Sequence, residues 1–87
     1  MRIFVKNLPR TMTEDQLSRL FAAYGTVTDV EIPLEEETQR SRGWGHVHMP
    51  DAMEAHAAMA GLHGQTIEGQ RLLVTQAYWQ GARRVQP

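Results

Sequence analysis

The chain contains no cysteine among its 87 residues. This absence excludes disulfide bonds, thiolate zinc sites and cysteine nucleophiles, and it fits a reducing compartment. No apolar run approaches the roughly 20 residues that span a bilayer, and the opening stretch MRIFVKNLP lacks the longer apolar core of a secretory signal. We therefore expect a cytoplasmic protein with no membrane partner.

An excess of positive charge is also missing, because the formal net charge is −1. The chain therefore has no overall positive field of the kind that marks many nucleic-acid binders, and any such binding must come from a local arrangement of basic residues. Candidate nucleophiles are few, since the only serines are Ser18 and Ser41, and the sequence places no histidine and acid to activate either of them. We do not expect an enzyme.

Hydrophobic periodicity predicts four strands and two helices. Residues 2–6 alternate between aliphatic and other side chains, as expected for a strand with one buried face. Thr13 begins the first helix, with Gln16 as its capping-box partner. Asp51 and Glu54 are predicted to take the same two roles in the second helix. The predicted elements are strand 2–6, helix 13–25, strand 27–34, strand 40–49, helix 51–64 and strand 71–75.

This β-α-β-β-α-β order predicts an α+β protein of the ferredoxin-like class, with two helices on one face of a four-stranded antiparallel sheet. Burial of aliphatic side chains drives folding, so the aliphatic side of each strand must face the helices. Aromatic side chains left on the opposite face indicate a binding partner. The predicted core comprises Ile3, Val5, Leu17, Leu20, Phe21, Tyr24, Val30, Ile32, Val47, Met49, Ala55, Ala58, Met59, Leu62, Leu72 and Val74. The predicted open face comprises Phe4, Lys6, Glu31, Trp44, His46, His48, Arg71, Leu73 and Thr75.

Two short segments share a pattern of aromatic, basic and small residues. IFVKNL, residues 3–8, has an aromatic at its second position, and RGWGHVHM, residues 42–49, begins with a basic residue and a glycine. Together they resemble the two motifs of the RNA recognition motif family, and the resemblance covers residues 2–77. Trp44, His46 and Met49 depart from the usual longer motif. The compact chain is similar to the free-standing members of this family found in bacteria.

The resemblance implies that the open sheet face binds single-stranded RNA with modest affinity and specificity. Single-stranded DNA is a further candidate ligand, and a monomer is expected. Phe4 and Trp44 are expected to stack on bases, and His46 stands where the family has a second stacking aromatic. The remaining candidate RNA-binding residues are Lys6, Arg40, Arg42 and Arg71 as phosphate contacts, Asn7 as a base contact or a cap of local backbone, and His48 on the same strand face.

Two other interpretations compete with RNA binding for these residues. The spacing of His46 and His48 is compatible with a metal, but no third ligand is evident, so neither a metal nor a cofactor is expected. A protein-binding module that uses the exposed Trp44 face is the principal alternative function.

The length of the chain allows one domain, which we expect to cover residues 1–78, and residues 79–87 are expected to form a short flexible tail. Tyr78 and Trp79 would cover Trp44, extend the platform around it, or pack at the edge of the core. His56 and His63 are expected to be ordinary surface residues.

Overall fold

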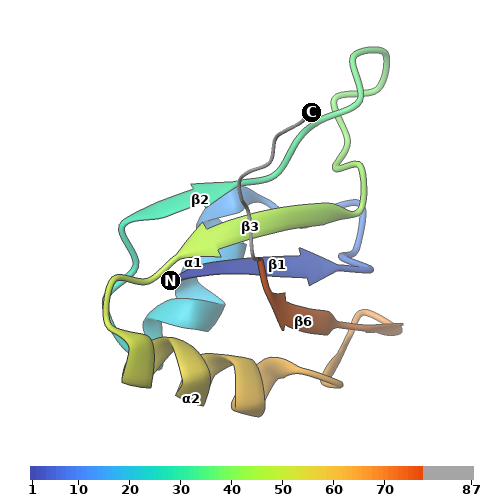
Figure 1. The fold of residues 1–87 in the computed structure, drawn as a ribbon. Coiled ribbons are helices and arrows are strands. Elements are labelled where there is room, and N and C mark those ends of the chain that lie inside the picture. Colours follow the sequence, from blue (N-terminus) through green and yellow to red (C-terminus); the bar gives the residue numbers. More distant parts are fainter. Residues whose placement is uncertain (78–87) are drawn as a thin grey trace, which may run out of the picture.

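Two helices lie against one face of a four-stranded antiparallel sheet in the computed structural model, which describes residues 1–77 (Figure 1). The strands of this sheet are in the order β2-β3-β1-β6, which confirms the predicted ferredoxin-like fold. The elements are β1 (Arg2–Lys6), α1 (Glu14–Ala22), β2 (Asp29–Glu31), β3 (Trp44–His48), α2 (Ala52–Leu62), β4 (Thr66–Ile67), β5 (Gln70–Arg71) and β6 (Leu73–Gln76).

A small two-stranded sheet, formed by β4 and β5, is an addition to the predicted order. Arg71, which we expected in the last strand, lies on β5, and β6 begins at Leu73. The hairpin turn passes through Glu68 and Gly69, both with a positive φ. Gly64, also with a positive φ, lies just before the hairpin, and its backbone N–H donates to the carbonyl of Leu72 at 2.8 Å.

The core lies between the sheet and the helices, and it is built mainly from the predicted residues. Val30, Leu20, Tyr24 and Met59 are only partly buried. Val30 belongs to the three-residue edge strand β2, where the sheet ends and neighbouring cover is incomplete. The buried apolar residues are Ile3, Val5, Leu8, Met12, Leu17, Phe21, Ile32, Val47, Met49, Ala55, Ala58, Leu62, Leu72 and Val74.

The first helix begins as predicted, because the side chain of Thr13 accepts from the backbone of Gln16 and the side chain of Gln16 accepts from the backbone of Thr13. The second helix differs from the prediction. Asp51 caps it alone, and the carboxylate of Glu54 accepts instead from the backbone N–H of Thr26 at 3.0 Å. Glu54 therefore ties α2 to the turn that leads into β2.

His63 is also more than the ordinary surface residue that we expected. Its Nδ1 accepts a hydrogen bond from the backbone N–H of Val74 at 2.9 Å. Val74 lies on β6, the edge strand of the sheet, so this contact satisfies a backbone donor that no neighbouring strand can reach.

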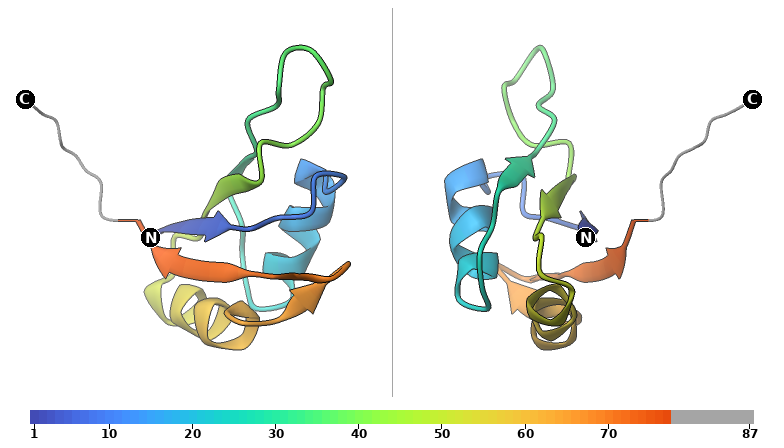
Figure 2. Two further views of the ribbon diagram at one scale, coloured as in Figure 1. Left: turned by 90° about the vertical axis from the view of Figure 1, so that its right-hand side faces the viewer. Right: turned by 60° about the vertical axis from the view of Figure 1, so that its left-hand side comes forward.

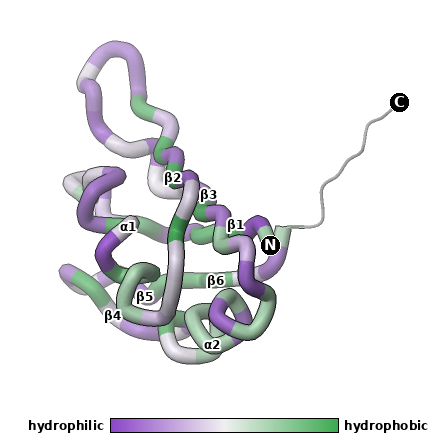
Figure 3. Tube along the Cα trace, turned by 90° about the vertical axis from the view of Figure 1, so that its left-hand side faces the viewer, coloured by the Kyte–Doolittle hydropathy of each residue, from purple (hydrophilic) through white to green (hydrophobic). Residues whose placement is uncertain are grey.

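The loop between β2 and β3 projects beyond the sheet in both views of Figure 2. Figure 3 shows that this loop is mostly hydrophilic, whereas α2 is hydrophobic along much of its length. None of the helices within residues 1–77 is long and apolar enough to cross a membrane. The predicted flexible tail, 79–87, and the three alternatives for Tyr78 and Trp79 concern residues outside the described part of the chain.

Candidate nucleic-acid interface

Strand register arranges the open face of the sheet in three rows that run across the strands. The first row contains Leu73 on β6, Lys6 on β1 and Trp44 on β3. The second row contains Thr75, Phe4, His46 and Glu31, and the third contains Arg2, His48 and Asp29. Because side chains alternate along a strand, all of these residues project from the face opposite the helices. The face is thus basic on β1, aromatic in the centre and acidic along the β2 edge.

Three rings form a continuous aromatic strip over β1 and β3. The ring centroids of Phe4 and Trp44 are 5.5 Å apart, and those of Trp44 and His46 are 6.3 Å apart. The rings are tilted against one another by 57° and 40°, which is typical of aromatic pairs that avoid a face-to-face sandwich. The Nζ atom of Lys6 lies 5.6 Å from the Phe4 centroid. All three predicted stacking residues are therefore brought together.

Glycines on both sides of Trp44 explain how the tryptophan reaches this position. Gly43 has a φ of +94°, and its carbonyl accepts from the backbone N–H of Leu8 at 2.9 Å. A Cβ at Gly45 would lie 2.6 Å from the backbone carbonyl oxygen of Glu31. Any larger residue at position 45 would push β2 away from β3. The glycines therefore hold β2 and the loop close to the strand that presents Trp44.

The His46 ring lies between a basic side chain, Arg2, and an acidic side chain, Glu31. Arg2 Nη1 lies 3.2 Å from His46 Nδ1, and because a guanidinium can only donate, Nδ1 must accept and the ring proton must be on Nε2. Nε2 in turn lies 3.3 Å from a carboxylate oxygen of Glu31. Neither Arg2 nor Glu31 is among the predicted site residues, although the alternation that selects Phe4 also puts Arg2 on the same face.

Two hollows adjoin the aromatic strip. The smaller one, about 290 Å³ in volume, lies at the N-terminal end of β1. It is lined by Arg2, Phe4, His46 and Ala77. The larger one, about 500 Å³, lies at the other end of β1 and is lined by Lys6, Asn7, Leu8, Arg10, Arg42, Gly43, Trp44, Gln70 and Leu73. This larger hollow, which we call the basic hollow, thus combines three cations with a partly exposed tryptophan.

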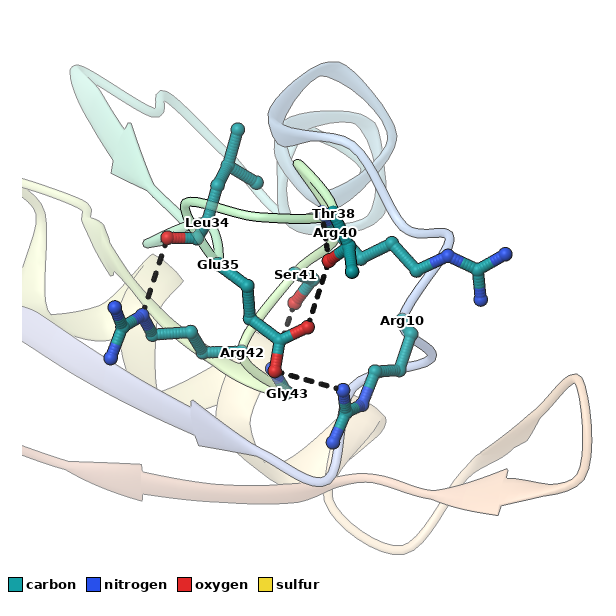
Figure 4. Close-up of polar contacts among 8 residues, drawn as sticks. All are labelled: Arg10, Leu34, Glu35, Thr38, Arg40, Ser41, Arg42 and Gly43. Atoms are coloured by element: carbon teal, nitrogen blue, oxygen red, sulfur yellow. Dashed lines mark hydrogen bonds and ion pairs between the residues drawn. The ribbon is translucent and has the colours of Figure 1, made fainter.

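The β2–β3 loop forms one wall of the basic hollow, and Figure 4 shows how its charges are paired. Arg10 Nη1 donates to Glu35 Oε2 at 3.1 Å, and the other carboxylate oxygen of Glu35 accepts from the hydroxyl of Thr38 at 2.9 Å. Arg42 donates from Nε to the carbonyl of Leu34 at 3.2 Å. Arg40 extends away from this cluster. Arg10 is a site residue that sequence reasoning missed, because only the fold brings it against the loop.

Asn7, another candidate, serves the local structure. Asn7 has a φ of +63°, and its side-chain amide donates to the carbonyl of Arg71 at 2.9 Å. Its side-chain oxygen accepts from Gln70 at 3.3 Å, so Asn7 caps local backbone, which was the second of the two expected roles. Arg71 itself lines neither hollow.

His48 contacts two groups at the edge of the open face. Its Nδ1 lies 3.0 Å from the hydroxyl of Thr28, and its Nε2 lies 3.4 Å from the amino terminus. Over residues 1–77 no group of three or more histidine, aspartate or glutamate side chains could hold a metal ion.

Comparison with known proteins identifies the family. The model of the RNA recognition motif matches residues 3–73, and the chain belongs to this family. The chain is 43% identical over 77 residues to the putative RNA-binding protein RbpA of Nostoc sp., covering 88% of this chain and 76% of that protein. It is 42% identical over 76 residues to the chloroplastic RNA-binding protein CP31B of Arabidopsis thaliana, covering 87% of this chain but only 26% of that protein.

A solved structure of an SXL-lethal protein in complex with RNA superposes with a TM-score of 0.81 at 37% identity. The match covers 87% of this chain and 47% of that chain. These matches confirm the resemblance drawn from the two motifs, including the likeness to compact bacterial members of the family.

Proposed function

We propose that the open sheet face binds single-stranded RNA, with bases stacked on Phe4, Trp44 and His46 and phosphates held in the basic hollow. The observation that carries this proposal is the aromatic strip that continues directly into the basic hollow through Trp44. Single strands expose the faces of their bases, and a stack on an aromatic side chain contributes roughly 1–3 kcal/mol per base.

The distribution of charge on the face supports one path for the RNA backbone. Lys6, Arg10 and Arg42 all line the basic hollow, whereas Asp29 and Glu31 occupy the β2 edge. Phosphates are attracted to the first group and repelled by the second, so the backbone lies over the basic hollow and away from the β2 edge. A few stacks and phosphate contacts, less the cost of ordering the strand, correspond to dissociation constants on the order of micromolar.

The names of the relatives support the same class of ligand, because RbpA and CP31B are both described as RNA-binding proteins and the SXL-lethal complex contains RNA. Recognition of single-stranded DNA, a monomeric state and a cytoplasmic location remain predictions from the sequence. We also infer that the domain binds without catalysing a reaction, since an open sheet excludes no water from a reacting group.

A protein partner is the second candidate function, and the exposed Leu73, which lies in the same row as Trp44, is the observation in its favour. We favour RNA because the same tryptophan borders three cations, which an apolar protein contact would have to desolvate.

An NMR titration of labelled protein with a pool of short single-stranded RNA tests the proposal. We expect shifts of the backbone amides of residues 2–7 and 42–49 that diminish as the salt concentration rises, because phosphate contacts release counterions. The amides of α2 are the internal control, since that helix lies behind the sheet. An absence of shifts at millimolar RNA and low salt would refute RNA binding. Shifts that did not depend on the salt concentration would indicate an apolar contact without phosphates, and they would favour the second candidate function, protein binding.

A further inference from the structure

We propose that Glu31 and Arg2, held on either side of the His46 ring, make the open face selective for guanine over the other three bases. This inference rests on the proposed RNA binding. It names the base that is selected around the second row of the face, which contains Phe4, His46 and Glu31. It starts from the contacts of His46, whose two ring nitrogens lie 3.2 Å from an Arg2 nitrogen and 3.3 Å from a Glu31 oxygen. The imidazole thereby orients a donor group and an acceptor group at opposite sides of one stacking surface.

Both charged groups retain hydrogen-bonding capacity toward a ligand. The Glu31 side chain is 62% exposed, and over residues 1–77 the only polar contact of its carboxylate is the one with His46. Arg2 likewise uses a single terminal nitrogen, in the contact with His46, within the described part of the chain. Arg2 also lines the smaller hollow together with Phe4 and His46, so its guanidinium borders space that a base stacked on these rings can enter.

The position of Glu31 determines what kind of group it can meet. It lies on the edge strand β2, directly across from His46 and two residues from Asp29, so the local potential is negative. A phosphate would be repelled from this edge, and only hydrogen-bond donors are favourable partners for the carboxylate. The donors of single-stranded RNA are the ribose 2′-hydroxyls and the N–H groups of the bases, and only a base can offer two adjacent donors to one carboxylate.

Guanine is the base whose edges match this pair of groups. Its N1–H and N2–H₂ are adjacent donors that a carboxylate accepts in a bidentate manner, and its O6 and N7 are adjacent acceptors for an arginine. Adenine and cytosine each offer one amino group next to a ring acceptor, which a carboxylate would oppose. Uracil offers a single N–H between two carbonyl oxygens. Only guanine therefore satisfies Glu31 with two donors and Arg2 with two acceptors.

The test measures binding of the labelled RNA pentamers UUXUU, with X as guanine, inosine, adenine, cytosine or uracil, by fluorescence anisotropy. Wild-type protein is expected to bind the guanine pentamer about fivefold or more tightly than the others, since a bidentate pair discriminates by roughly 1–3 kcal/mol. Inosine lacks the N2 amino group, so its pentamer should lose a large part of this preference.

Two variants separate selectivity from charge. Glu31→Gln keeps the size of the side chain but replaces one acceptor by a donor, and it should reduce the preference for guanine over inosine to nearly one. Asp29→Asn is the matched control, because it removes one negative charge from the same strand without altering the group that contacts His46. It should keep the preference intact.

Equal binding of all five pentamers by the wild type would overturn the inference while leaving RNA binding established. A preference that Glu31→Gln and Asp29→Asn reduce to the same extent would also overturn it, since the effect would then follow net charge. Failure of every pentamer to bind at millimolar concentration would instead refute the proposed function itself.

Discussion

Replacement of Trp44 by alanine is the most direct perturbation of the proposed stacking platform. The indole lies in the row formed by Leu73 and Lys6, and its ring centroid is 5.5 Å from that of Phe4. Loss of one base stack should weaken RNA binding by roughly 1–3 kcal/mol, or about five- to 150-fold in Kd. The cost to folding should be smaller, about 1 kcal/mol, because the main loss is the aromatic pair with Phe4.

Leu73→Ala is the matched control for this experiment. Leu73 is 42% exposed, lies in the same row and also lines the basic hollow, but it has no ring on which a base can stack. Binding is measured by fluorescence anisotropy at fixed salt, and folding by the thermal transition in circular dichroism. RNA stacking predicts a much larger loss for Trp44→Ala than for Leu73→Ala, and partial recovery in Trp44→Phe. Equal losses in the two alanine variants would refute stacking, and an unfolded Trp44→Ala variant would invert the assignment of the two faces.

Two further predictions concern the fold that supports this face. Val47→Asp should abolish folding, because Val47 is fully buried beneath the face and an unpaired charge there costs several kcal/mol; a native circular dichroism spectrum would contradict this core assignment. His63→Ala should destabilise the domain by about 1 kcal/mol in a urea titration, because the backbone N–H of Val74 loses its acceptor. His56→Ala, an exposed change on α2, the helix that His63 caps, should change stability by no more than a few tenths of a kcal/mol. Equal effects of the two substitutions would argue against the His63 contact.

The alternation of residues along the strands predicts most of this fold. In residues 2–6 and 44–48 every second side chain is aliphatic or small, and this pattern alone assigns Phe4, Trp44 and His46 to the open face. The cap of α1 was equally predictable, because Thr13 and Gln16 have the spacing of a capping box and no competing partner. These features depend on near neighbours in the sequence, so the sequence contains enough information to identify them.

The features that sequence reasoning missed depend on contacts between distant segments. Glu54 has the spacing of a capping residue, but the turn before β2 brings the N–H of Thr26 within 3.0 Å of its carboxylate, and that partner is preferred. Arg10 joins the site only because the β2–β3 loop folds back toward the loop after β1, 25 residues away from Glu35. Neither contact can be inferred from periodicity or motif spacing.

The ion pair between Arg10 and Glu35 leads to a quantitative test of how RNA enters the basic hollow. If Lys6, Arg10 and Arg42 each neutralise one phosphate, the plot of log K against log salt should have a slope of about −2, since single strands give about −0.7 per phosphate. If Arg10 stays paired with Glu35, the slope should be about −1.4.

Glu35→Gln decides between these two cases, because it removes the competing carboxylate charge and leaves the size of the side chain unchanged. A paired Arg10 predicts tighter binding at low salt and a steeper slope in the variant, whereas an Arg10 that already exchanges Glu35 for phosphate predicts tighter binding with an unchanged slope. The matched control is Glu37→Gln, since Glu37 is exposed and its carboxylate makes no ion pair within residues 1–77. A chain with a net charge of −1 can bind a polyanion only through local contacts between basic side chains and phosphates. RNA binding that did not depend on salt in either variant would therefore contradict the proposed role of the basic hollow.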